Sequence, residues 1–257
     1  MQALLHDSSR LRIGLGTFVA VDAQANTANT ARLGVAAAYD AVALVEKLMH
    51  PTRGGSDLAA LRACPQGLPL SIHPWTWEVL EICQHLNRLS HGIFDPCLPE
   101  SAGGITDLEL TQSSTVVLHA AVRLDLGGIA KGYAVDRALE ALRASGCHGG
   151  LVNAGGDLAV FGACSRSIVC GSRRAGNAVV ALKNAALASS DAGHEARPSE
   201  HRGYYHGADR NSIVSGKITV VAASAAIADG LTKCLLIGNG ALNDRLLDAF
   251  RARRIDY

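Results

Sequence analysis

The spacing of apolar and polar side chains predicts a strand followed by two long helices in the first part of the chain. Apolar and polar residues alternate over residues 14–23, which is typical of a strand entered through a turn at Gly16-Thr17. Residues 30–49 place apolar side chains near one helical face, at Leu33, Ala37, Val42, Val45 and Leu48. A second helix opens at His73-Pro74, where proline is tolerated in the first turn, and ends near His91-Gly92.

The second half of the chain is richer in predicted strands. Short apolar or β-branched runs predict strands at 115–118, 151–152, 167–170, 178–182 and 217–222. Ser224 is a suitable N-cap for a helix that runs to Ile237, and a last helix covers about 242–251. Strands that come in runs, without regular βαβα alternation, favour an α+β fold over a parallel α/β fold.

Three segments lack a regular pattern. Residues 56–58 begin a short irregular piece, because a glycine and two prolines mark turns soon after them. Residues 100–111 carry a glycine pair, and we expect them to form a connection. Residues 192–211 are polar and rich in histidine, arginine and glycine, which predicts a mobile surface loop.

The stretch from Arg123 to Gly162 carries the strongest chemical signal. Asp125 precedes the glycine pair Gly127-Gly128, and Lys131 follows at the mouth of a predicted helix. The next strand ends in a second glycine pair, beside Asp157. Glycines let the backbone approach a ligand closely, and the first N–H groups of a helix attract anions, so we interpret the stretch as a phosphate or pyrophosphate site. The alternative is a tight strand–helix turn with an incidental lysine.

Composition narrows the possible functions. Aromatic residues make up 4% of the chain, which argues against a stacking surface for single-stranded nucleic acid. A net charge of +1 without a long basic run argues against nucleic acid and anionic membranes as partners. Seven cysteines without a C-x-x-C motif fit reduced thiols. The start, MQALLHDSSR, lacks an apolar core, so we expect no signal peptide. No segment reaches the roughly 18 uninterrupted apolar residues that span a membrane, so we expect no membrane insertion and, with reduced thiols, a cytoplasmic location.

Taken in order, these motifs resemble those of the FAD:protein FMN transferases, the ApbE family. The two specific matches are DLGGIAKGYAVD at 125–136 and LVNAGGDLAVFG at 151–162. The weaker ones are LGT at 15–17, MHPTRGGSDL at 49–58, GIFDP at 92–96, SSD at 189–191 and ITVVAASAAIADGLTK at 218–233. The resemblance is collinear and covers nearly the whole chain.

The resemblance implies a transferase that binds FAD with Mg²⁺ and splits its pyrophosphate. FMN would be attached through a phosphoester to a threonine or serine of a target flavoprotein, with release of AMP. In phosphoryl transfer the catalyst mainly positions groups and neutralises charge, which agrees with the anion site inferred above. The implied fold is α+β and related to the T-fold, with a mixed, largely antiparallel sheet core flanked by helices. We expect a single domain over 1–257, in which residues 30–95 could form a helical lobe.

The same resemblance implies the site residues, position by position. The carbonyl of Ala130 and the carboxylate of Asp229 would hold Mg²⁺, which prefers hard oxygen ligands. The residues that would line the flavin nucleotide are Leu15, Ile93, Phe94, Asp95, Lys131 and Ala134. His206 and Asp229 would be catalytic, with His206 taking the proton of the acceptor hydroxyl, because imidazole titrates near working pH. From the residues alone, a solvated loop histidine is the favoured interpretation of His206.

The chain departs from the family pattern at three positions. Leu15 replaces a methionine, and Thr52 stands where the family has a tyrosine that stacks on the flavin. Lys233 replaces a metal-binding threonine four residues after Asp229, and Thr232 lies one helical step, about 100°, from that place. Asp229 and Lys233 are i,i+4 and could pair directly. Three alternatives follow: a helix-surface salt bridge, a reduced Mg²⁺ site, or an ammonium that partly substitutes for the metal.

Other functions stay open at this level. A catalytically weakened FAD-binding protein would keep the fold without the transfer. A Mg²⁺-dependent FAD pyrophosphate hydrolase would split FAD without an acceptor. A different nucleotide enzyme could also use the same glycine sites. The sequence does not identify the acceptor flavoprotein.

Overall fold

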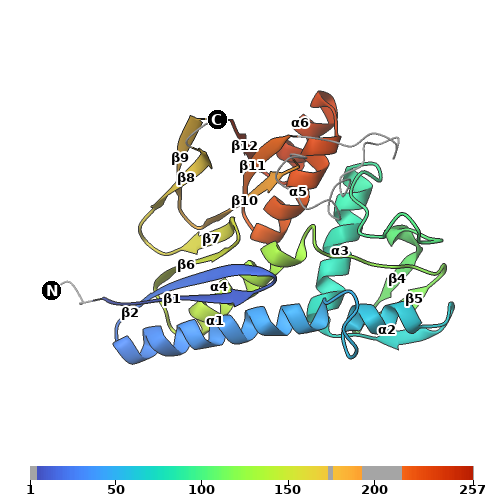
Figure 1. Cartoon of the computed structure of the whole chain (residues 1–257), viewed down its shortest axis with the longest axis horizontal. Helices are drawn as coiled ribbons and strands as arrows, with labels where there is room; N and C mark the ends of the chain where they lie inside the picture. Colours follow the sequence, from blue (N-terminus) through green and yellow to red (C-terminus); the bar gives the residue numbers. More distant parts are fainter. Residues whose placement is uncertain (1–4, 173–175, 193–215, 257) are drawn as a thin grey trace.

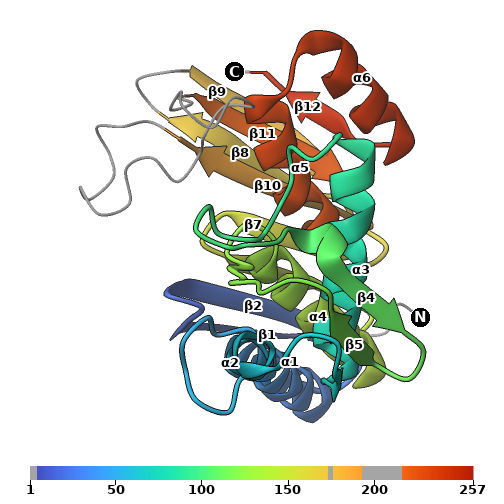
Figure 2. The ribbon, with the colours of Figure 1, turned by 90° about the vertical axis from the view of Figure 1, so that its right-hand side faces the viewer.

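A seven-stranded sheet forms the centre of the computed structural model, which describes residues 5–172, 176–192 and 216–256. In order across the sheet, its strands are β1 (His6–Gly14), β2 (Thr17–Ala25), β6 (Gly149–Ala154), β7 (Asp157–Phe161), β10 (Ala185–Asp191), β11 (Lys217–Ala222) and β12 (Arg253–Ile255). All neighbouring strands in this order pair antiparallel. Figure 2 shows them stacked from β1–β2 below to β10–β11 above. The predicted α+β class with a largely antiparallel sheet is confirmed.

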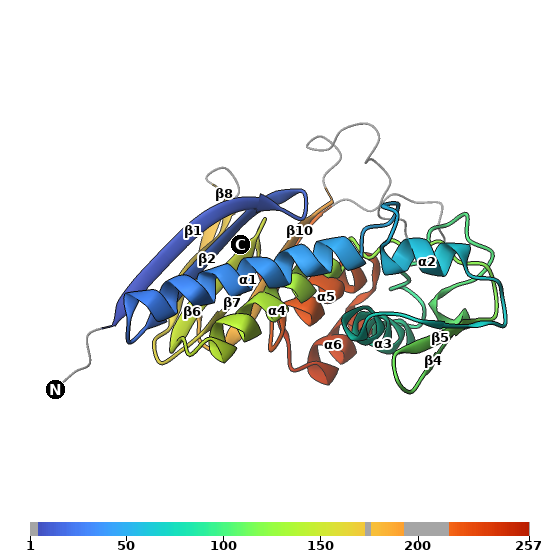
Figure 3. The same cartoon turned by 90° about the horizontal axis from the view of Figure 1, so that it is seen from below.

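The helices gather on one side of this sheet, as Figures 1 and 3 show. Their bounds are α1 Ala28–Leu48, α2 Asp57–Ala63, α3 Pro74–Leu89, the 3₁₀ turn η1 Ile105–Asp107, α4 Ala130–Ala144, α5 Ala225–Ile237 and α6 Gly240–Ala249. Helix α4 packs between α1 and α5, and α5 also covers β10 and β11. A small sheet and α2 lie at the opposite end of the molecule from the N-terminus (Figure 3). That sheet has the order β3 (Pro69–Ser71), β5 (Thr115–Leu118), β4 (Leu108–Thr111), and a separate hairpin joins β8 (Arg166–Ser172) to β9 (Gly176–Leu182).

Two apolar cores meet along α4. The first joins α3, α5 and the small sheet, and includes the fully buried Leu80 and Leu231. The second joins α1 to β2 and β6, and includes Val19 and Val152. Helix α4 contributes Tyr133 to the first core and Val135 and Leu139 to the second. The start of α4 is therefore fixed from both sides, which positions the residues of its first turn.

Most of the predicted long elements are present within a few residues. The helices predicted at 30–49, from His73-Pro74, and from Ser224 to Ile237 correspond to α1, α3 and α5, and the Ser224 side chain caps α5. The irregular piece predicted at 56–58 is wrong, because Ser56 caps the short helix α2. The connection predicted at 100–111 contains η1 and β4. The strand predicted from residue 14 begins at Thr17, since Gly14 ends β1, a strand that the pattern did not predict.

The predicted surface loop, the membrane expectation and the domain division have separate outcomes. The loop predicted at 192–211 lies outside the described residues, apart from Ala192. Within the described ranges, every helix is too short or too polar to cross a membrane. The division into a single domain with an early helical lobe stays a prediction.

Candidate functional site

Two tight hairpin turns lie at the same end of the large sheet. Leu15-Gly16 joins β1 to β2 and Gly155-Gly156 joins β6 to β7, and all four residues have positive φ. Two-residue turns with positive φ at both positions match the natural twist of a hairpin. Because Val19 pairs with Ala154, the two turns are neighbours. A Cβ on Gly155 would lie 2.7 Å from Oγ1 of Thr17, so the turns pack closely only with glycine there.

Helices α4 and α5 cross at Gly132, next to these turns. A Cβ on Gly132 would lie 2.2 Å from the carbonyl oxygen of Ala225 and 2.8 Å from the nitrogen of Ala226. The backbones therefore approach as closely as only glycine allows. The N–H of Gly132 donates a hydrogen bond to Oδ2 of Asp229 at 3.2 Å. The crossing thus brings the first turn of α4 against the first two turns of α5.

Four charged side chains meet at this crossing, and we call them the Lys–Asp cluster: Lys131, Asp157, Asp229 and Lys233. Nζ of Lys131 lies 3.0 Å from Oδ2 of Asp157 and 3.7 Å from Oδ2 of Asp229. Nζ of Lys233 contacts Oδ1 of Asp229. The Asp229 side chain is fully buried and that of Lys233 is 11% exposed, whereas that of Lys131 is 31% exposed. The two positive and two negative charges balance, and Lys131 is the member that reaches furthest toward solvent.

Because the cluster is buried, one of the three alternatives for Lys233, a salt bridge on the helix surface, does not apply. The predicted i,i+4 pair between Asp229 and Lys233 is present. It is not a helix-surface salt bridge, because both side chains are buried. The aliphatic stem of Lys233 packs on the glycine pair before α4, where a Cβ on Gly128 would lie 3.5 Å from Cε of Lys233. The stem of Lys233 is therefore in van der Waals reach of the segment that precedes α4.

The electrostatic environment acts on two aspartates near the crossing. Burial and then the neighbouring carboxylate of Asp229 raise the pKa of Asp157, and Lys131 and Lys233 offset part of that shift. Burial also raises the pKa of Asp136 to about 6, against the hydrogen bonds that favour its ionised form. Those bonds come from the N–H groups of Ala225 and Ala226, at 2.8 and 2.9 Å. Asp136 on α4 thus holds the first turn of α5.

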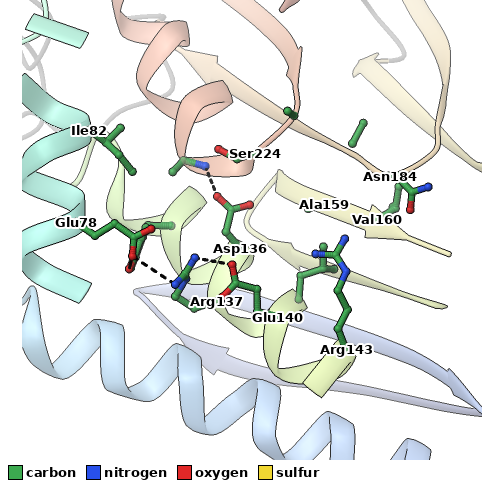
Figure 4. Close-up of a pocket in the computed structure, with 15 residues that line it drawn as sticks. Glu78, Ile82, Asp136, Arg137, Glu140, Arg143, Ala159, Val160, Asn184 and Ser224 are labelled. Carbon is green, nitrogen blue, oxygen red and sulfur yellow. Dashed lines mark hydrogen bonds and ion pairs between the residues drawn. The ribbon is translucent and has the colours of Figure 1, made fainter. Parts of the chain in front are cut away.

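A pocket of about 210 Å³ lies on the other side of this contact, between α4 and the first turn of α5. Figure 4 shows Asp136 pointing to that turn, with Arg137 between Glu78 and Glu140. The ion pairs of Arg137 measure 3.4 Å to Glu78 and 2.5 Å to Glu140. The lining residues do not include the Lys–Asp cluster. The pocket is lined by acidic and basic side chains alike, so it offers no single charge preference to a ligand.

Two hydroxyl groups form a hydrogen-bond chain to the backbone carbonyl of Asp229. The hydroxyl of Thr232 donates to the carbonyl oxygen of Asp229 at 2.6 Å. Its oxygen lies 2.7 Å from Oγ of Ser190, which then acts as the donor in that bond. Thr232 is fully buried. Its hydroxyl therefore links β10 to α5, in keeping with the prediction that Thr232 does not take the place of the residue at 233.

The residues predicted to line the nucleotide occupy different surroundings. Leu15 forms the first hairpin turn, and Phe94 is buried next to Gly128 and Gly230. The carboxylate of Asp95 accepts the N–H groups of Cys97 and Ile105 at 2.9 and 3.2 Å, so it holds a turn. The partly buried Ile93 packs on the first core, and Ala134 is fully buried within it. The structure brings Lys131 and Asp229 together, and the roles of the others stay predictions.

The predicted metal ligands and catalytic base have different outcomes. Ala130 is the first residue of α4, and Asp229 lies beside the start of that helix. No group of three or more histidine, cysteine, aspartate or glutamate side chains gathers in the described ranges in a way that could hold a metal. His206 lies outside the described residues. The described chain continues up to Ala192 and resumes at Gly216, whose carbonyl oxygen accepts the N–H of Ala192 at 2.8 Å.

Sequence reasoning did not assign a role to three residues at this site. Asp157 was noticed only as the neighbour of a glycine pair, and Asp136 only as the last letter of a motif. Gly132 followed Lys131 in the same motif, where a glycine in the first turn of a helix signals a close approach. These residues are far from α5 in sequence, so no local pattern predicted that they contact this helix.

Comparison with known proteins bears on the fold and on the family motifs. The ApbE family model matches residues 15–102 and 98–251. No curated protein matches the chain in sequence. The apo form of the flavinyl transferase ApbE of Pseudomonas stutzeri has a TM-score of 0.82 and 19% identity, over 99% of this chain and 92% of that one.

Two further solved structures are similar. The flavin transferase ApbE of Vibrio cholerae has a TM-score of 0.77 and 17% identity, over 98% of this chain and 93% of that one. The ApbE protein of Thermotoga maritima has a TM-score of 0.76 and 21% identity, over 96% and 91%. At these identities the likeness establishes the fold over nearly the full length of each chain.

Proposed function

The chain belongs to the ApbE family, whose model matches almost all of it, and we propose that it is a FAD:protein FMN transferase. The observation that carries the proposal is the Lys–Asp cluster, in which Lys131 and Asp157, each beside a glycine pair, meet Asp229 and Lys233 of α5. Phosphoryl transfer requires fixed positive charge beside the phosphates, and Lys131 places an ammonium at the exposed side of this cluster. The ApbE protein of Pseudomonas stutzeri shares the fold and is named a flavinyl transferase.

The proposed reaction exchanges one phosphorus–oxygen bond for another. The hydroxyl oxygen of a threonine or serine on the acceptor flavoprotein forms a bond to the FMN phosphorus of FAD. The bond from this phosphorus to the oxygen of the AMP phosphate breaks, and AMP leaves with the electron pair. The hydroxyl proton passes to a base, for which we propose His206. Lys131 would contact the pyrophosphate oxygens and stabilise the charge that develops on them.

The flavin and adenine parts of FAD require apolar neighbours. We propose that the first hairpin turn and the segment after α3 supply them, next to the glycine pair before α4. The segment after α3 lies close to that pair, since the ring of Phe94 lies 3.8 Å from where a Cβ on Gly128 would be. The apolar residues concerned are Leu15, Ile93 and Phe94, with Ala134 acting through packing because it is fully buried. Asp95 would act by holding the turn next to Phe94.

Mg²⁺, which the family resemblance implies, fits the described residues poorly. The carboxylate of Asp229 already receives Lys233 on Oδ1 and the N–H of Gly132 on Oδ2. Lys131 approaches the same carboxylate, and the charges of the cluster balance without a metal. A divalent cation at Asp229 with Ala130 would have to displace an ammonium and leave it buried near a second positive charge, which is costly. We therefore assign no step to Mg²⁺.

The test is direct transfer of flavin to an acceptor. Purified chain is incubated with FAD and a flavoprotein domain that carries an attachment threonine, and protein-bound flavin is read by in-gel fluorescence while AMP is quantified. We expect fluorescent acceptor and AMP in equal amounts, and neither with a threonine-to-alanine acceptor. AMP release without acceptor labelling would indicate a FAD pyrophosphate hydrolase instead. Intact FAD under every condition would refute the proposal.

A further inference from the structure

Lys233 is unusual because its long, charged side chain is largely buried. Its side chain is 11% exposed and its ammonium contacts Oδ1 of the fully buried Asp229. Lysine is almost never buried to this extent unless it is paired. The stem packs against Gly128: a Cβ placed on this glycine would lie 3.5 Å from Cε of Lys233. The fold thus holds an ammonium in place at the glycine pair, beside the start of α4.

The second ammonium of the cluster faces the same carboxylate from α4. Lys131 lies 3.7 Å from Oδ2 of Asp229, on the other oxygen from Lys233. Each ammonium carries three N–H donors, so the pairing of Lys233 with Asp229 leaves it able to donate to a phosphate oxygen as well. Two lysines that are oriented by buried carboxylates form a preorganised site for a group with two adjacent negative phosphates.

We propose that Lys233 supplies, as a fixed ammonium, the positive charge that a divalent metal would otherwise bring to the pyrophosphate of FAD, so that the chain binds FAD and transfers FMN without a metal ion. This inference rests on the proposed function. No covalent bond forms to Lys233: it donates hydrogen bonds to the phosphate oxygens while the acceptor oxygen replaces AMP at phosphorus. Asp229 then serves to hold Lys233 and Lys131 in position.

The proposal makes opposite predictions for the wild-type chain and for a chain without the ammonium. In Lys233→Met, Lys131 is the one ammonium of the four-residue cluster that remains beside Asp229 and Asp157, so these described side chains carry one excess negative charge. Such an oxygen-rich, negatively charged place favours a divalent cation. We therefore expect Lys233→Met to bind Mn²⁺ where the wild-type chain does not. We also expect its affinity for FAD in EDTA to fall by about ten-fold or more, since hydrogen bonds to charged groups are strong.

The experiment measures FAD binding by titration calorimetry in EDTA and in Mg²⁺, and Mn²⁺ binding by electron paramagnetic resonance. The wild-type chain should bind FAD about equally in both buffers and label its acceptor in EDTA. Lys183→Met is the matched control, because Lys183 is exposed between β9 and β10, at the far end of the sheet, and should change neither reading. Circular dichroism checks that each variant is folded.

The outcomes separate this inference from the proposed function. FAD binding or transfer by the wild-type chain that disappears in EDTA would overturn the metal-free site while leaving the transferase proposal intact. Mn²⁺ bound tightly by the wild-type chain would overturn it as well. An absence of FAD binding in both buffers would overturn both proposals. Because the decisive measurements use the wild-type chain, the inference stays testable even if Lys233→Met does not fold.

Discussion

The crossing of α4 and α5 at Gly132 leads to a strong expectation for the variant Gly132→Ala. The added Cβ would lie 2.2 Å from the carbonyl oxygen of Ala225, and Cβ atoms essentially never come within 3.0 Å of another heavy atom. The atom it meets belongs to the backbone and cannot rotate away. That backbone is also held by Asp136, which accepts the N–H groups of Ala225 and Ala226. The two helices would therefore have to separate.

The size of the effect follows from two opposing contributions. Overpacking a buried contact costs about 1–3 kcal/mol, and a rigid backbone partner places this site at the upper end. Alanine gains about 1 kcal/mol over glycine in helix propensity, because glycine loses more conformational freedom on folding. The expected net loss in the free energy of unfolding is about 2 kcal/mol. Separation of the helices also lengthens the bond from Gly132 to Asp229, so binding of FAD should weaken.

Urea unfolding, followed by circular dichroism, measures the loss of stability, and calorimetry measures FAD affinity. Gly240→Ala is the matched control, because Gly240 opens α6 and a Cβ there would meet no heavy atom within 4 Å. This control should be neutral or stabilising by up to about 1 kcal/mol. If Gly132→Ala were as stable as Gly240→Ala, the close crossing would be wrong.

Two further changes test the surroundings of the site. Burial raises the pKa of Asp136 to about 6 from 3.8, so its contribution to stability is full below about pH 4 and is lost as the pH rises through about 6. Asp136→Asn should therefore flatten the fall in unfolding free energy between about pH 4 and about pH 7, by an amount on the order of 2–3 kcal/mol, measured by urea unfolding at both pH values; an unchanged slope would contradict the assignment. Gly155→Ala should lose more stability than Gly16→Ala, because both have φ near +65° but only Gly155 faces Thr17, at 2.7 Å. Thermal unfolding of both variants compares them, and equal losses would show that the contact between the turns is unimportant.

Local signals in the sequence predicted the long helices well. Ser224 before an apolar run identified α5 to the residue, because an N-cap hydroxyl is a short-range signal. The same kind of cap at Ser56 was missed, since α2 is short and lies among glycines and prolines. Strand β1 was missed because most of its residues are exposed and polar. It lies at the edge of the sheet, and its extended conformation depends on pairing with β2 and not on a pattern of its own.

The site was predictable only in part, for a geometric reason. The glycine pairs and Lys131 could be read as an anion site because they are close in sequence. Asp229 is nearly a hundred residues from Lys131, and only the resemblance to a family linked the two. The i,i+4 spacing correctly predicted the pairing of Asp229 with Lys233. It could not predict that the pair is buried, because burial depends on α4, whose approach is permitted by Gly132.

The balanced charges of the Lys–Asp cluster explain how such a site can exist before its ligand arrives. Two lysines brought together without carboxylates would repel each other, and burying them unpaired would be strongly unfavourable. Asp157 and Asp229 remove that cost and fix both ammonium groups during folding. A bound pyrophosphate would then share the lysines with these aspartates, so its binding energy is reduced by the competition. The gain is orientation: the phosphates meet donors already in place, which is what the positioning of a transferred phosphoryl group requires.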